Sequence, residues 1–428
     1  MNYALRQTLL GCALVFFASP DAHSQSRSTA QLRYYAFALT DHAPSLEDAQ
    51  AIAKGELAID EAIEAMLASD AHLERVRRYF HDWFGFLDYP GLLLDDKLLH
   101  VDENDIYQRT DGLIPCGPDD TIEIEAWWLD PGETITTCTN LGPTDACADE
   151  EDDDDILECG CGELMLGCIP IQDLPAASSS LSQEFGHRAV EAYTQDRTWF
   201  ELLGGDYLYA NRYVYHYYLY TGSPYTFPPG TQEQVEALRS VGLNSREVID
   251  FPEGAERAGV VTSPMFLTRF NNFRSRIRAL TGNLLCRDVT GESNVDQTTT
   301  FYNEDLDELT LTHADNPDCS YCHYPMDNMG STIMHWEEEG TLYEPLSTVG
   351  HVYGETGEGP AFLIRGYIER APEFMPCMAK RAWESFSGAS WDTLSDEQQA
   401  AFIEEAKLGP RNLLQKVMLS PLMRELRR

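Results

Sequence analysis

Two cysteines and a histidine form the one sharply defined chemical motif of this sequence. Cys319 and Cys322 are separated by two residues, and His323 follows immediately. At this spacing two thiols can add to the vinyl groups along one porphyrin edge, while the imidazole that follows binds the iron. The motif therefore predicts one covalently attached haem c, with His323 as its proximal iron ligand.

Two other uses of these residues stay open. A Cys-x-x-Cys pair in an exported protein can be a plain disulfide or a redox pair, and two cysteines with a histidine can be half of a zinc site. A structural zinc site needs a second pair at similar spacing, and the other close pair, Cys159 and Cys161, has no histidine nearby. The haem interpretation is favoured over a disulfide, and zinc comes last.

The sequence does not single out a sixth ligand for the iron. A methionine would raise the reduction potential and suit electron transfer, whereas an open position would suit peroxide or oxygen chemistry. Met375-Pro376 resembles a pair found around distal ligands in small cytochromes c, and His351 lies in a glycine-rich loop. The candidates are His313, Met334, His335, His351, Met375 and Met378.

The first 24 residues predict export. They combine the basic Arg6, an apolar core from Leu9 to Ala18 and a small-x-small cleavage site that ends at Ser24. Covalent haem attachment also takes place outside the bacterial cytoplasm, so the signal peptide and the motif support one another. We expect a periplasmic or extracellular protein, and since no later stretch approaches 18 apolar residues, we expect no membrane span.

Charge restricts the partners. The chain of 428 residues holds 71 acidic and 30 basic side chains, for a net charge of −41. A polyanion is repelled by nucleic acids and anionic membranes, which excludes both as expected partners. A redox partner protein with a basic surface is favoured instead.

Residues 113–175 differ in kind from the rest. They are rich in Pro, Gly, Thr and Asp and include a run of seven acids at 149–155, which we interpret as a solvated loop rather than a calcium site. Such a segment builds little core, so disulfides are expected to staple it. Any β-strand is expected here. Its six cysteines are Cys116, Cys138, Cys147, Cys159, Cys161 and Cys168.

Elsewhere the apolar spacing is helical and predicts a mainly α protein with long loops and a cytochrome c-like haem-binding unit. Ser45, with Asp48 three residues later, predicts the start of a pair of helices that reaches Phe86. Tyrosines between 207 and 220 are interpreted as helix packing. The predicted regions are 1–24 (signal peptide), 25–112 (helical), 113–175 (cysteine-rich acidic insert), 176–256 (helical, Tyr-rich), 257–350 (haem c-binding) and 351–428 (helical).

Basic side chains gather between 257 and 278, which is unusual in so acidic a chain. Arginine suits haem propionates because its donors form a fork, but it suits neighbouring acids equally well. Both uses stay open. The arginines concerned are Arg257, Arg269, Arg274, Arg276 and Arg278.

The order of these segments resembles exported bacterial proteins, common in planctomycetes and myxobacteria, in which consecutive conserved domains of unknown function surround one c-type haem motif. The departures are Asn328, where the family usually has proline, and Met334 and Trp336, where it usually has an acid and an aromatic residue. The matching stretches are the N-terminal helices ending at Trp83, Asp206 to Asn211, Arg257-Ala258-Gly259 with the Thr-x-Pro that follows, Leu284 to Cys286, His313 to Gly330 and Phe374 to Cys377.

The resemblance implies a haem protein and a disulfide between Cys286 and Cys377, with the insert cysteines paired among themselves. Together with the motif, it favours an exported c-type haem protein that carries electrons in an extracytoplasmic oxidative or respiratory system. One alternative is a haem-dependent peroxidase or oxidoreductase that acts on an extracellular substrate. The other is a haem-free, disulfide-rich binding module.

Overall fold

The computed structural model describes residues 20–86, 98–110, 119–141, 161, 163–220, 237–251, 257–287, 326–334, 336 and 349–426. Outside these ranges lie the Cys-x-x-Cys-His motif, His313, His335, most of the predicted signal peptide, the acidic run and Cys116, Cys147 and Cys159. The chain divides into two compact units, one of residues 76–417 and a smaller one of residues 1–75 with 418–428. Each region predicted from composition is continuous in sequence, whereas the smaller unit of the structure combines residues from both ends of the chain.

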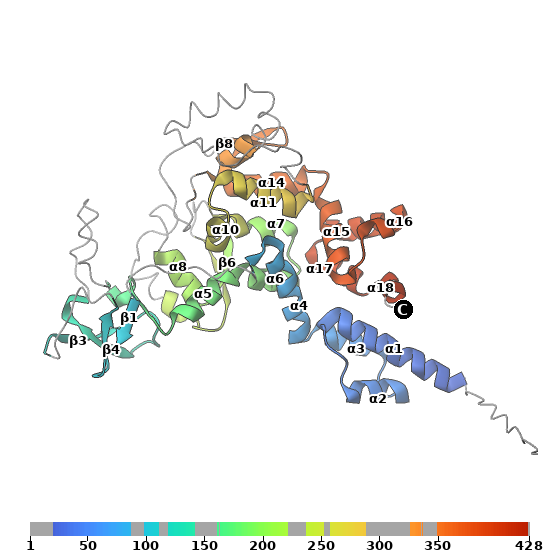
Figure 1. Cartoon of the computed structure of the whole chain (residues 1–428), viewed down its shortest axis with the longest axis horizontal. Coiled ribbons are helices and arrows are strands. Elements are labelled where there is room, and N and C mark those ends of the chain that lie inside the picture. The colour runs from blue at the N-terminus through green and yellow to red at the C-terminus, as the bar shows by residue number, and fades with distance from the viewer. Residues whose placement is uncertain are drawn as a thin grey trace, which may run out of the picture. The chain divides into compact units, whose positions relative to one another are not determined.

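The smaller unit is helical (Figure 1). The predicted helix start at Ser45 is confirmed, because its hydroxyl accepts a hydrogen bond of 3.0 Å from the backbone N–H of Asp48. The predicted helix pair is three helices, since Gly55 adopts a positive φ and ends the first of them. Leu32, Ile52 and Ala62 form the core. The helices are α1 (Pro20–Thr40), α2 (Leu46–Lys54), α3 (Ile59–Leu67), the start of α4 (Asp70–His81) and α18 (Pro421–Leu426).

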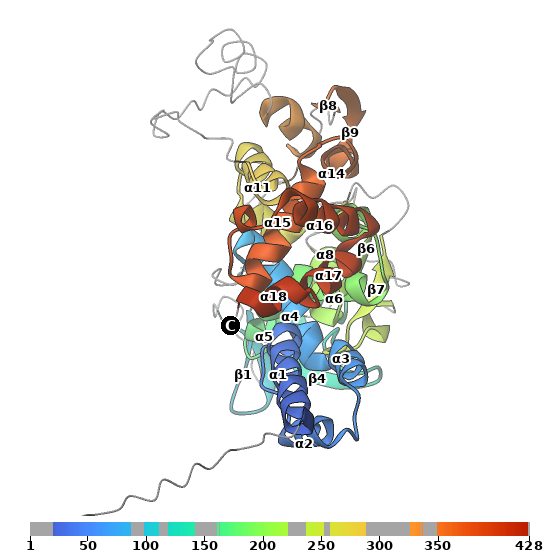
Figure 2. The same ribbon diagram turned by 90° about the vertical axis from the view of Figure 1, so that its right-hand side faces the viewer.

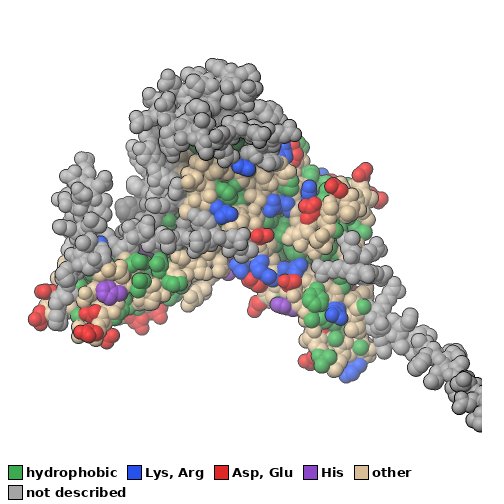
Figure 3. Space-filling model, in the orientation of Figure 1, with side chains coloured by type: hydrophobic (Ala, Val, Ile, Leu, Met, Phe, Trp, Pro, Cys, Tyr) green, Lys and Arg blue, Asp and Glu red, His purple; other side chains and the backbone are tan. Residues whose placement is uncertain are grey.

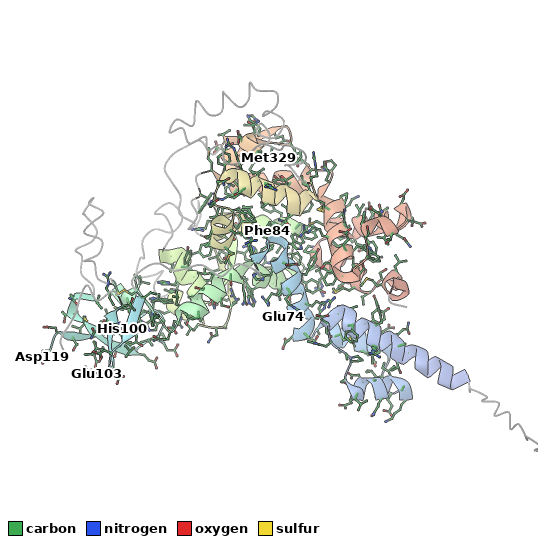
Figure 4. All side chains as sticks on the ribbon, in the orientation of Figure 1. Glu74, Phe84, His100, Glu103, Asp119 and Met329 are labelled. Carbon is green, nitrogen blue, oxygen red and sulfur yellow. A yellow bond between two sulfur atoms is a disulfide. The ribbon has the colours of Figure 1, made fainter. Side chains whose placement is uncertain are left out.

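Aromatic rings fill the centre of the larger unit, whose helices Figures 1 and 2 show. Trp83 is 4.8 Å from Phe80 and 6.1 Å from Trp199, and Trp199 is 5.9 Å from Phe374, all between ring centroids. The rings come from α4 and the turn η1 (Asp82–Phe84), from α7 (Trp199–Gly204) and from α15 (Phe374–Ser387). Figure 4 places Phe84 among these helices. Most of the described secondary structure is helical, so the prediction of a mainly α protein is confirmed.

The remaining helices of the larger unit surround this centre or continue from it. They are α5 (Leu174–Ser182), α6 (Glu184–Thr194), α8 (Arg212–Tyr220), η7 (Gly259–Thr262), α10 (Pro264–Arg269), α11 (Phe273–Leu285), η8 (Ser331–Ile333), α14 (Gly359–Glu369), η9 (Trp391–Thr393), α16 (Asp396–Leu408) and α17 (Pro410–Met418), with short 3-10 turns η3 (Thr139–Leu141) and η6 (Glu163–Met165). None of the helices in the described ranges combines the length and the hydropathy that a membrane span requires.

Strands are more widespread than predicted. A five-stranded sheet has the order β3-β4-β2-β1-β5, in which β1 pairs antiparallel with β2 and β3 with β4. Two further antiparallel pairs, β6 with β7 and β8 with β9, lie far from the insert in sequence. The confinement of strand to 113–175 was wrong. The bounds are β1 (Leu98–Val101), β2 (Ile106–Arg109), β3 (Thr121–Glu125), β4 (Thr134–Cys138), β5 (Ile169–Pro170), β6 (Tyr207–Ala210), β7 (Glu247–Asp250), β8 (Val349–Val352) and β9 (Glu355–Glu358).

A stacked ring pair fastens the insert to α8. The rings of Trp127 and His216 are parallel, with centroids 3.7 Å apart. Trp127 Nε1 donates to the carbonyl of Cys168 at 3.0 Å, and His216 Nε2 lies 2.7 Å from the carbonyl oxygen of Leu166. Both acceptors belong to the loop that the Cys161–Cys168 disulfide closes. The insert is therefore held by a neutral, buried histidine.

We expect His216 to make folding pH-dependent. Burial lowers its pKa to about 4 from 6.5, so between these values the unfolded chain binds a proton that the folded chain does not. Stability is then lost as the pH falls from about 6.5 to about 4, by roughly 1.4 kcal/mol per unit. Urea unfolding at about pH 7 and pH 4.5 measures this loss. His216→Gln is expected to remove about 2–3 kcal/mol of the pH difference, whereas His42→Gln, at an exposed histidine of the smaller unit, should leave it unchanged.

Candidate functional site

The described ligand candidates lie at three elements, η8, β8 and α15. Met334 is half-buried at the end of η8, and Met378 is fully buried in α15. His351 is exposed on β8, where its Nδ1 is 2.8 Å from the hydroxyl of Thr356. Met375, in the first turn of α15, lines a cavity. Among the described residues, no group of three or more His, Cys, Asp or Glu is placed to hold a metal ion.

The segment that follows the motif is anchored to α11. Arg274 donates from Nε and Nη2 to the two carboxylate oxygens of Asp327, at 2.7 and 3.2 Å. Buried Arg276 donates to the carbonyl oxygens of Ile333 and Trp336. Met329 lies beside α11 (Figure 4). Forked donors satisfy two acceptors at once, so the arginines fix this segment where the chain emerges from the motif.

These contacts bear on the two uses left open for the arginines. Arg274 pairs with an acid, whereas Arg276 donates to carbonyl oxygens. Arg269 likewise donates to the carbonyl oxygen of Phe84, at 2.9 Å. Arg278 is exposed on α11. Arg274 follows the acid-pairing alternative, and Arg269 and Arg276 have a third use that the sequence did not indicate, which is to join backbone segments.

β8 packs directly on the same segment. Gly350 lies so close to η8 that an added Cβ would be 2.5 Å from the methyl of Thr332. The hydroxyl of Ser331 donates to the carbonyl of Val349 at 2.9 Å. Met334 and His351 therefore sit on two elements in contact, while Met375 sits on a different helix.

A buried cluster of charged and phenolic groups connects α6, β6 and α8. The hydroxyl of Tyr218 is 3.1 Å from both carboxylate oxygens of Glu184. The hydroxyl of Tyr207 donates to Glu191 at 3.0 Å, and Arg197 donates to the two oxygens of Glu191 at 2.8 and 2.9 Å. Burial raises the pKa of Glu184, although the guanidinium of nearby Arg188 acts in the opposite direction.

Arg257 links this cluster to the segment that follows the motif. Its guanidinium carbon is 4.5 Å from the ring centroid of Tyr218 and 4.9 Å from that of Trp336. Burial lowers the pKa of Arg257 to about 10, but the side chain stays charged near neutrality. A phenol that donates a hydrogen bond to a carboxylate can pass its proton to that carboxylate. Tyr218 and Glu184 have the geometry for this.

Sequence reasoning treated the tyrosines as packing and missed the cluster. A signal was present, because Glu184, Arg188 and Glu191 recur at helical spacing and so share one face of α6 with apolar residues. Charged residues at core positions indicate a buried network.

Disulfides follow the expected pattern where the structure describes them. Cys286 and Cys377 are joined, with Cα atoms 5.4 Å apart, as the resemblance implies. Within the insert, Cys161 is joined to Cys168, and Cys138 is also disulfide-bonded. No protein family, curated protein or solved structure matches this chain.

Proposed function

We propose that this chain is an exported c-type haem protein that carries electrons in an extracytoplasmic oxidative or respiratory system. The observation that carries the proposal is the Cys319-x-x-Cys322-His323 motif in the sequence. The two cysteines would hold the haem covalently, and His323 would be its proximal ligand. The haem would supply one-electron redox chemistry.

The anchored segment supports this proposal. Met326 is three residues from His323, and three residues span at most about 11 Å, so a haem on this motif is tethered near Met326. Met334 and His351 belong to η8 and β8 in the same neighbourhood, and both side chains are suitable iron ligands. We propose one of them as the sixth ligand ahead of Met375.

The compartment and the surface fit the same role. The Cys286–Cys377 and Cys161–Cys168 disulfides are typical of an oxidising compartment, where haem attachment also takes place. Acidic side chains gather over the five-stranded sheet, where Glu103 and Asp119 lie (Figures 3 and 4). Such a surface steers basic partners at low ionic strength, which suits a redox partner protein.

An absorption spectrum tests the proposal. The chain is expressed with a cytochrome c maturation system, and spectra are recorded oxidised and reduced, with and without carbon monoxide. We expect a haem band that survives denaturing extraction and is unmoved by carbon monoxide, because a side chain occupies the sixth position. Cys319→Ser combined with Cys322→Ser should lose the covalent band, because neither thioether bond can then form. A wild-type protein without haem would overturn the proposal and favour the haem-free binding module.

The same experiment identifies the sixth ligand. Met334→Ala and His351→Ala are compared with Met375→Ala as the matched control. We expect carbon monoxide to shift the band of one of the first two variants only, since removal of the true ligand opens the iron. A shift confined to Met375→Ala would contradict the assignment.

A second candidate function is a haem-dependent oxidoreductase that acts on an extracellular substrate. The observation that favours it is the cavity of about 480 Å³ lined by Met375, which is large enough for a small molecule. A wild-type haem band that shifts with carbon monoxide would place this function first, because it would show an exchangeable site on the iron.

A further inference from the structure

A cavity of about 480 Å³ lies between four helices of the larger unit. Its volume falls within the range of about 300–1,000 Å³ typical of small-molecule sites. The walls come from the start of α7, the second half of α14, the start of α15 and the end of α16. The lining includes Trp199, Phe200, Arg365, Met375, Lys407 and Leu408.

The walls are preformed. Trp199 Nε1 donates to the carbonyl of Ala406 at 2.7 Å, which joins α7 to the last turn of α16. The ring of Trp199 also packs edge-on against Phe374 of α15. Thr198 caps α7 through a reciprocal pair of bonds with Glu201. These contacts within the protein fix α7 against α15 and α16, so no ligand is needed to form the cavity.

The lining offers exposed apolar surface. Leu408 is 67% exposed, which is unusual for a leucine, and the half-buried side chains of Phe200, Ile368 and Met375 also line the cavity. An apolar group that enters would remove this surface from water, at about 25 cal/mol for each Å² buried. The cavity therefore favours a ligand with an apolar body.

Arg365 provides an oriented cation beside this surface. Its guanidinium carbon is 4.9 Å from the ring centroid of Phe200. Among the described residues the nearest carboxylate is that of Glu369, 3.9 Å from Nε of Arg365, and none of these residues makes a hydrogen bond to the guanidinium. A guanidinium held over an aromatic ring keeps its forked donors in a fixed plane, which suits a carboxylate.

We propose that this cavity binds a small monocarboxylate with an aromatic or branched aliphatic body. Arg365 receives the carboxylate, and the side chains of Phe200 and Leu408 cover the apolar body. A dianion is disfavoured, because the carboxylate of Glu404, 2.6 Å from Lys407 Nζ, already pairs with the second cation and Glu369 in the lining repels additional negative charge. This inference does not depend on haem.

Calorimetric titration of the mature protein with three ligands of matched shape tests the class. The probes are 2-naphthoate, the neutral 2-naphthalenemethanol and the dianionic 2-naphthyl phosphate. We expect 2-naphthoate to bind at least about tenfold more tightly than either of the others, because it alone carries one charge for Arg365. Absence of measurable naphthoate binding, or equal binding of the neutral probe, would overturn the proposal.

Two variants locate the site. Arg365→Gln should weaken naphthoate binding by about tenfold and remove the preference over the neutral probe. Arg287→Gln is the matched control, since the two arginines are 53% and 56% exposed and each lies near a carboxylate, and it should change binding less than about twofold. Phe200→Ala should weaken the binding of both 2-naphthoate and the neutral 2-naphthalenemethanol. Equal effects of Arg365→Gln and Arg287→Gln would place the binding elsewhere.

Discussion

Replacement of Arg188 by methionine is expected to lower the free energy of unfolding by about 3–5 kcal/mol. The side chain is 2% exposed and donates to the carbonyl oxygens of Glu201, Leu202 and Gly205 at 2.8–2.9 Å, and to that of Tyr207. The first two belong to the last turn of α7, where carbonyl groups have no partner within the helix. Methionine fills the space but leaves these oxygens buried without a donor.

Urea unfolding followed by circular dichroism measures this effect. Arg287→Met is the control, because this arginine is 56% exposed and its ion pair with Glu373 is expected to contribute less than about 1 kcal/mol. Arg188→Lys should be intermediate, since an ammonium keeps the charge but loses the fork. A loss below about 1 kcal/mol for Arg188→Met would show that water replaces the guanidinium. It would contradict the claim that Arg188 is needed to satisfy the last carbonyl groups of α7.

Removal of the Cys286–Cys377 disulfide is the second large expected effect. Its cysteines are 91 residues apart in sequence, and the chain-entropy relation gives about 4.6 kcal/mol of stabilisation for a loop of this length. We expect Cys286→Ala combined with Cys377→Ala to lose about this much stability. The same loop contains the Cys319-x-x-Cys322-His323 motif, so the bond also limits how far this motif can lie from α11 and α15.

The Cys161–Cys168 disulfide supplies the comparison. Its cysteines are only seven residues apart, and the relation gives about 2.4 kcal/mol. Urea unfolding of the two double alanine variants should therefore rank the longer loop above the shorter one. The reverse order would mean that packing around the insert, including the stacked Trp127 and His216, outweighs loop closure.

Local signals in the sequence were sufficient for the helices but not for the sheets. Ser45 and Asp48 act within one turn, so the start of α2 could be predicted from neighbours alone. β1 has four residues, Leu98 to Val101, and no alternation of polar and apolar types, so period-two analysis finds nothing in it. Its identity as a strand comes from pairing with β2 and β5, which is tertiary information.

The candidate site shows the same limit. Motif spacing singles out Cys319, Cys322 and His323 as the proposed haem site, because covalent attachment would need all three residues within one short segment. The charged residues on one face of α6 indicate that Glu184 is buried, but neither its pairing with Tyr218 nor the cavity around Arg365 leaves a local signature, since the partners are far apart in sequence. Tyr218 and Glu184 are 34 residues apart in sequence and meet only in the folded chain. The same holds for α14 and α7, which form two walls of the cavity.

The composition of the smaller unit has a consequence for biosynthesis. Because residues 418–428 belong with residues 1–75, the larger unit is inserted within the sequence of the smaller one. The N-terminal helices are synthesised first, but their unit is complete only after residues 418–428 have left the ribosome. Until then α1 to α3 lack part of their unit, so the core of the smaller unit stays incomplete while the whole of the larger unit is being synthesised.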